Sequence, residues 1–182
     1  MIYKTKKLGF TIIELLVVIA VISLLASIVL QSLNSARVKA RNSQRLITVD
    51  QIHKAFEVAV AGVSNQSVPT VGWACLGSVT TGCNGTTQVN VDNILKAGMG
   101  GGIIPKDPKF TTGIGSSYLY NSNLVGVTVS GDCTAGACPD GAYLSWVMED
   151  VGLPTSQICG SGKYWGNTAN GPQCLLRVGD LN

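Results

Sequence analysis

The strongest pattern in the sequence is an apolar run near the N-terminus that continues as a helical repeat. Residues 10–33 are almost entirely apolar, and 24 helical residues can cross a bilayer core of about 30 Å. From residue 34 to 61, apolar side chains recur every three or four positions, which is typical of one helix face. No glycine or proline occurs in residues 10–61, so we expect one continuous helix that stops at Gly62. The repeating positions are Val38, Leu46, Val49, Ile52, Phe56, Ala59 and Val60.

The opposite side of this second helical segment is polar. Arg45, Gln51, Lys54 and Glu57 fall largely off the apolar face, so we expect them to point away from it. His53, the single histidine of the chain, also lies in this segment. It has no second histidine or cluster of acids near it in sequence, so we expect a residue packed at a helix–head boundary rather than a ligand or a base.

After residue 61 the pattern changes to short apolar stretches separated by turn residues. Residues 62–113 are rich in turns, with one short helix predicted at 91–97. The short apolar stretches are predicted strands, and together they predict a small antiparallel sheet. This sheet would cover the apolar face of the long helix, which gives an α+β fold. The predicted strands are residues 117–120, 124–130, 142–148 and, more weakly, 173–178.

Two loops in this part invite comparison with binding sites. Gly98-Met-Gly-Gly-Gly102 lacks the glycine spacing and the strand–loop–helix context of a phosphate loop, so we expect a hinge or tight turn. A Gly/Asn-rich loop lies between Cys159 and Cys174, and Tyr164 and Trp165 inside it are expected to pack as anchors of that loop.

Six cysteines lie beyond the apolar run, and an even number in an exported domain is typical of disulfides. Their spacing favours three local pairs, although fifteen pairings are possible. The absence of a C-x-x-C motif and of a second histidine disfavours zinc. The predicted pairs are Cys75 with Cys83, Cys133 with Cys138, and Cys159 with Cys174.

The distribution of charge argues against a nucleic-acid-binding protein. Three lysines precede Gly9, and without them the formal net charge of +3 becomes zero. From residue 66 onward, seven acidic residues outnumber five basic ones, so the head has no basic patch. The cations that follow the apolar run are expected to meet lipid headgroups or neighbouring subunits, and they are Arg37, Lys39, Arg41 and Arg45.

A carboxylate within the apolar run is the most unusual feature of the N-terminus. Glu14 would cost about 2.5–3.5 kcal/mol in a membrane, so it marks a functional site. The residues K-K-L-G-F-T-I-I-E-L at 6–15 resemble the class III signal peptide of type IV pilins and type II secretion pseudopilins. A second likeness to major pseudopilins is P-K-D-P at 105–108 followed by Y-x-Y at 118–120.

The resemblance implies both processing and assembly. A prepilin peptidase would cut after Gly9, Phe10 would be N-methylated, and Glu14 would help subunits to polymerise with copies of themselves and with other pilins on an inner-membrane platform. The chain would span the inner membrane once with its head outside the cytoplasm, and would then join a periplasmic or cell-surface filament. The cations on both sides of the span leave the orientation open, and the resemblance settles it.

The resulting segments are a leader (1–9), a membrane and polymerisation half (10–33), an amphipathic half (34–61) and a head (62–182). The head divides into a loop region (62–113) and a region with the sheet and the disulfide-bounded C-terminus (114–182). The loop between Cys159 and Cys174 resembles the disulfide-bounded C-terminal region of type IVa pilins.

Several points stay open at the level of sequence. Gln31 stands where many relatives have a helix-kinking proline, and the cysteine-rich head differs from that of a minimal pseudopilin, so pilus and pseudopilus are both possible. The alternative function is a membrane-anchored, disulfide-rich binding module or a minor tip pilin. No catalytic site is recognisable, because His53 has no nucleophile motif near it and Glu149 and Asp150 point apart on a strand end. No cofactor is expected, although family analogy would allow calcium at Asp107, Asp132 or Asp140.

Overall fold

A computed structural model describes residues 9–61, 72–77, 85–109, 118–124, 138 and 140–178. The chain forms two compact units, Met1–Val38 and Lys39–Asn182. Helix α1 runs without interruption over Ile12–Ala61, which confirms the long helix that the sequence predicts.

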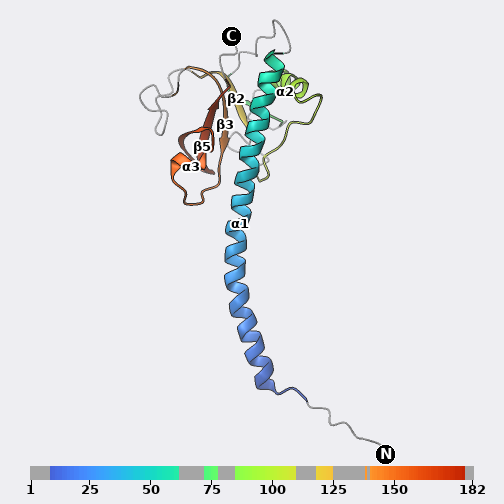
Figure 1. The fold of residues 1–182 in the computed structure, drawn as a ribbon, viewed down its shortest axis with the longest axis vertical. Helices are drawn as coiled ribbons and strands as arrows, with labels where there is room; N and C mark the ends of the chain where they lie inside the picture. The colour runs from blue at the N-terminus through green and yellow to red at the C-terminus, as the bar shows by residue number, and fades with distance from the viewer. Residues whose placement is uncertain are drawn as a thin grey trace, which may run out of the picture. The chain divides into compact units, whose positions relative to one another are not determined.

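The head contains a five-stranded antiparallel sheet with the strand order β1-β2-β3-β5-β4. Figure 1 shows this sheet and helix α2 beside the later part of α1. The fold is therefore α+β and similar to a pilin, as predicted. The strands are β1 (Ala74–Cys75), β2 (Leu119–Leu124), β3 (Gly141–Val147), β4 (Lys163–Thr168) and β5 (Gly171–Arg177).

Three strand predictions correspond to β2, β3 and β5, and two strands, β1 and β4, were missed. β4 lies in the stretch that the sequence suggested to be a Gly/Asn-rich loop. It forms a hairpin with β5, and the pairing register shifts between Tyr164 and Gly166. The predicted strand at 124–130 lies outside the described residues after Leu124. The two-residue strand β1 was also unexpected.

Two further helices complete the head. Helix α2 (Gly85–Gly98) includes the predicted helix at 91–97 but begins earlier, and α3 (Thr155–Ile158) was not predicted. The backbone at Gly98 approaches α1 so closely that a Cβ atom there would overlap the carbonyl oxygen of Ala55. The chain then turns at Gly101, whose N–H donates to the Lys96 carbonyl at 2.6 Å and whose φ of 83° favours glycine. The glycine run is a turn, as expected.

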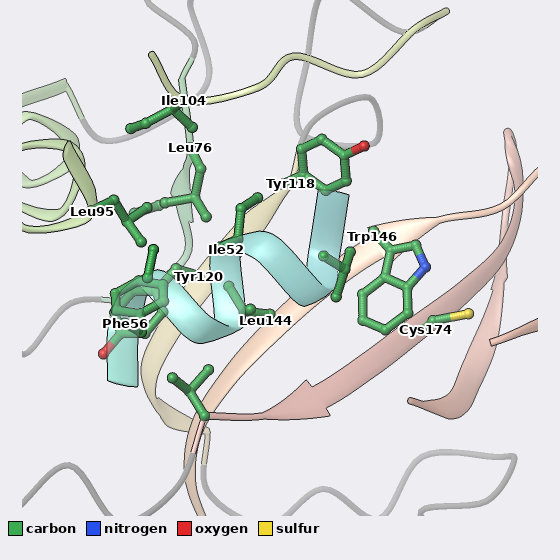
Figure 2. Packing of buried hydrophobic residues seen from close by; sticks show 14 of the residues in the cluster. Ile52, Phe56, Leu76, Leu95, Ile104, Tyr118, Tyr120, Leu144, Trp146 and Cys174 are labelled. Atoms are coloured by element: carbon green, nitrogen blue, oxygen red, sulfur yellow. The ribbon is translucent and has the colours of Figure 1, made fainter. Parts of the chain in front are cut away.

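The main core lies between the inner face of the sheet and one face of α1 (Figure 2). From α1 it takes Val49, Ile52 and Phe56, which belong to the predicted apolar repeat. The Phe56 ring stacks on Tyr120 of β2, with ring centroids 4.9 Å apart. Helix α2 contributes Val91 and Leu95, and β3 contributes Ala142, Leu144 and Trp146.

A smaller cluster covers the other face of the sheet. Tyr143 and Leu175 are buried there, and Trp165 packs against them and stacks on Trp73 with ring centroids 5.4 Å apart. Tyr164 packs against the main core instead. Both aromatic residues of the C-terminal hairpin are therefore packing anchors, as expected.

The C-terminal region contains the predicted Cys159–Cys174 disulfide, whose Cα atoms are 5.5 Å apart. A loop of this size contributes about 3 kcal/mol in the chain-entropy account of disulfides. Cys75 and Cys138 are also disulfide-bonded. Their predicted partners, Cys83 and Cys133, lie outside the described residues.

Candidate assembly site

The residues on both sides of the predicted cleavage position precede the first turn of α1. Gly9 and Phe10 are not helical, and the helix begins at Ile12. Phe10 is 89% exposed, and among the described residues nothing lies within 4 Å of the position that a Cβ atom on Gly9 would take. The peptide bond between them therefore lies outside regular secondary structure, and Phe10 on its C-terminal side is exposed.

Glu14 has a partner within its own chain that the sequence interpretation did not assign. Its Oε2 accepts hydrogen bonds from the backbone N–H and the side-chain hydroxyl of Thr11, both at 2.8 Å. In return, the backbone N–H of Glu14 donates to Thr11 Oγ1 at 3.3 Å. These reciprocal bonds form a capping box, with Thr11 as the N-cap residue of α1. The T-x-x-E spacing at 11–14 was the sequence signal that could have identified it.

The apolar half of α1 is exposed along its length. Its large apolar side chains between Phe10 and Leu33 are 43–89% exposed. Within the described residues, α1 is the one helix whose length and composition would let it cross a membrane, and its most apolar 18-residue window has a mean hydropathy of 2.9 with none of it buried. Such a surface needs lipid or other apolar helices around it.

In the head, α1 takes part in a partly buried cluster of charged and polar residues, which we call the Glu149 cluster: Arg41, Asn42, Arg45, Asp107, Lys109 and Glu149. Arg45 is fully buried and donates to both carboxylate oxygens of Asp107, at 2.7 and 3.0 Å. Arg41 donates to both carboxylate oxygens of Glu149, at 2.6 and 2.7 Å. The cluster attaches α1 to the loop after α2 and to the end of β3.

The remaining members of the cluster complete these attachments. Lys109 Nζ donates to Glu149 Oε2 at 2.8 Å, and Arg45 Nη1 donates to Glu149 Oε1 at 3.1 Å. The Asn42 side-chain amide donates to the Glu149 carbonyl at 2.8 Å and accepts from the Glu149 N–H at 3.0 Å. Hydrogen bonds from Arg41 lower the pKa of the Glu149 carboxyl to about 2, with further contributions from Lys109 and Arg45.

The Glu149 cluster corrects two expectations. Arg45 was expected to point away from the apolar face and to belong to a cation group at the membrane edge, but it is completely buried. Arg41 is also engaged with the head rather than left to meet lipid or neighbours alone. A cation is stable on the buried face because Asp107 and Glu149, far away in sequence, satisfy its donors.

The other candidate residues lie apart from these two places. His53 is half-buried on α1, with its Nδ1 3.7 Å from Glu57 Oε1 one turn later. Of the calcium candidates, Asp107 is engaged by Arg45, Asp140 is exposed and Asp132 lies outside the described residues. In the part of the chain that the structure describes, no three His, Cys, Asp or Glu side chains gather in an arrangement that could hold a metal ion.

Comparison with known proteins places the N-terminus in a defined class. Residues 4–30 match the family described as the prokaryotic N-terminal methylation motif. No curated protein and no solved structure matches the chain. The matched segment includes Gly9, Phe10 and Glu14 and continues into the exposed half of α1. This chain therefore carries the class III signal peptide of type IV pilins and pseudopilins.

Proposed function

We propose that the chain is a prepilin-like structural subunit of a type IV pilus or a type II secretion pseudopilus. The observation that carries the proposal is the methylation motif at residues 4–30, which leads directly into an exposed apolar helix. A prepilin peptidase cleaves after Gly9, and the new N-terminal residue, Phe10, is methylated. The processed subunit waits in the inner membrane with its head outside the cytoplasm.

Polymerisation follows from the chemistry of the apolar half. Residues 10–33 are stable in lipid, and they are stable against the same segment of other subunits and of other pilins. An assembly platform in the membrane can therefore move them from lipid to filament without exposing them to water. Glu14 needs a positive partner once it is buried in the filament, and the protonated amine of Phe10 in a neighbouring subunit supplies it.

The capping box supports this order of events. Before assembly, Thr11 satisfies Oε2 of Glu14 within the chain, which lowers the cost of holding a carboxylate close to lipid. Cleavage creates the Phe10 amine next to Thr11. The Glu14 carboxylate and the new Phe10 amine then lie four residues apart in the chain. Each can pair with the opposite group of a neighbouring subunit.

The processing step is tested on the mature protein. Intact-mass measurement and N-terminal sequencing are expected to give an N-methylated Phe10. A terminus near residue 36 would instead mean cleavage as an ordinary secretory signal, and it would overturn the proposal.

The assembly step is tested with three variants in the apolar half. Glu14→Ala is expected to insert in the membrane normally but to be lost from sheared filaments. Glu14→Gln keeps a residue that can complete a capping box but removes the charge, so it should fail in the same way. Ser27→Ala is the matched control, because Ser27 is a polar residue of the same segment whose hydroxyl donates to the Leu24 carbonyl at 2.7 Å.

The variants also separate the alternative function. Normal filament incorporation of Glu14→Gln would exclude pairing between the acid and the amine. Normal function of Glu14→Ala would favour the membrane-anchored binding module over a polymer subunit.

A further inference from the structure

A pocket lies in the head where β4 stops pairing with β5. The first pair between these strands is Lys163 with Leu175, whereas β5 continues to Arg177. Before Lys163 the chain forms a turn, in which the Gly162 N–H donates to the Cys159 carbonyl at 3.0 Å. The pocket at this place has a volume of about 200 Å³ and is lined by residues of β3, β4 and β5.

The lining of this pocket combines apolar side chains with two cations. Tyr143 and Leu175 line it and are buried. Lys163 and Arg177 line it as well, and among the described residues of the lining there is no acid. Arg177 is positioned by its Nη2, which donates to the Asp140 carbonyl at 3.2 Å. An apolar cavity of about 150 Å³ can bind benzene, so this pocket has room for a leucine side chain with a carboxylate beside it.

The loop after β3 presents both of these groups. Asp150 is exposed, and its Oδ1 accepts from the Gly152 N–H at 2.8 Å in a tight turn. Gly152 has a φ of 68°, which favours glycine. Leu153 follows and is 47% exposed, whereas Val151 packs against the main core. The loop therefore presents an exposed acid and an exposed leucine from a turn that Val151 anchors.

The pocket and this loop lie at opposite ends of β5. Gly171 is the first residue of β5, and a Cβ atom on it would lie 3.6 Å from the Asp150 backbone nitrogen. The pocket is at Arg177, the last residue of the strand. At about 3.4 Å per residue, these two ends are about 20 Å apart. One copy therefore cannot fill its own pocket with this loop, but a second copy can approach end to end.

We propose that the pocket at the β4–β5 edge binds the Asp150–Leu153 loop of a second copy of this chain. Leu153 enters the apolar part of the pocket, and Asp150 meets Lys163 and Arg177. The two patches differ, so the contact is heterologous and repeats from copy to copy instead of closing into a symmetric pair. As a contact between the heads of a filament, it rests on the proposed function.

Photo-cross-linking of the full chain in neutral detergent micelles tests the contact. Benzoylphenylalanine in place of Leu153 is expected to give a cross-linked dimer, and mass spectrometry should map the cross-link to β4 or β5 of the other copy. The control carries the same group in place of Ile103, which is 88% exposed and lies on the loop after α2, and it should not give this product.

Charge reversal then tests the pairing between copies. Lys163→Glu should lower the dimer yield by about tenfold, because it places like charges in contact, and Asp150→Lys should do the same. The double variant Lys163→Glu/Asp150→Lys restores opposite charges across the contact and should recover the yield. Lys54→Glu changes an exposed cation of α1 and is the control that should leave the yield unchanged.

Three results would overturn the contact: no recovery in the double variant, an equal loss with Lys54→Glu, or a cross-link from position 153 that maps outside β3, β4 and β5. Sheared filaments are scored separately. A wild-type chain that is absent from filaments but still gives the cross-link would contradict the proposed function and support the head contact. A chain that enters filaments but gives no cross-link would contradict the head contact alone.

Discussion

Replacement of Arg45 by methionine is the most direct test of the Glu149 cluster. The change removes hydrogen bonds of 2.7 and 3.0 Å to Asp107, of 2.8 Å to Asn42 and of 3.1 Å to Glu149. It leaves the Asp107 carboxylate 6% exposed without its guanidinium. Breaking a buried ion pair from one side costs about 3–5 kcal/mol, because the remaining charge stays uncompensated. That is a large share of the 5–15 kcal/mol typical of a whole domain.

Urea unfolding of the full chain in micelles, followed by tryptophan fluorescence, measures the change in the head. Arg37→Met is the control, because it removes an exposed cation of the same helix and should alter the free energy of unfolding by no more than about 0.5 kcal/mol. The double variant Arg45→Met/Asp107→Leu should be more stable than Arg45→Met alone, since it removes both charges. If Arg45→Met lowers the free energy of unfolding by no more than Arg37→Met does, the cluster does not stabilise the head.

Two further predictions concern pH and packing. The pKa of Glu149 is lowered from its ordinary value of 4.5 to about 2, so its contribution is complete above pH 4.5 and is lost as the pH falls towards 2. The loss is about 3 kcal/mol, and acid titration of the unfolding free energy should show a shallower decline in Glu149→Gln. Gly98→Ala should lower the free energy of unfolding by about 1–3 kcal/mol, because the new Cβ atom would overlap the Ala55 carbonyl oxygen. Thermal unfolding measures the loss, with Ala97→Ser at the exposed neighbouring position as the control. A Gly98→Ala protein as stable as the control would show that α1 and α2 can move apart freely.

The long helix could be predicted from sequence because its signals are local. An apolar run, a repeat of three and four positions and the absence of glycine and proline all lie within one continuous stretch. The same holds for the apolar side chains that α1 buries, such as Ile52 and Phe56. The capping box at Thr11 is equally local, since the T-x-x-E spacing at 11–14 is its sequence signal.

The Glu149 cluster could not be predicted, because its partners are distant in sequence. Arg45 lies 62 positions from Asp107 and 104 from Glu149. A helix pattern assigns arginine to solvent unless such partners are known, and only the tertiary fold brings them together. Strand β4 was missed for a different reason. Its Tyr164, Trp165 and Thr168 favour a strand, but Gly166 and Asn167 interrupt them and the whole stretch was interpreted as a Gly/Asn-rich loop.

The Glu149 cluster also has a mechanical consequence. Arg41 and Arg45 lie on successive turns of α1 and hold the same carboxylate, so the helix has one axial position relative to the head. A slip of one turn, 5.4 Å, would bring Val49 to the place of Arg45 and leave Asp107 facing an apolar side chain. A pull along α1 is therefore transmitted to the head through charged contacts that resist sliding.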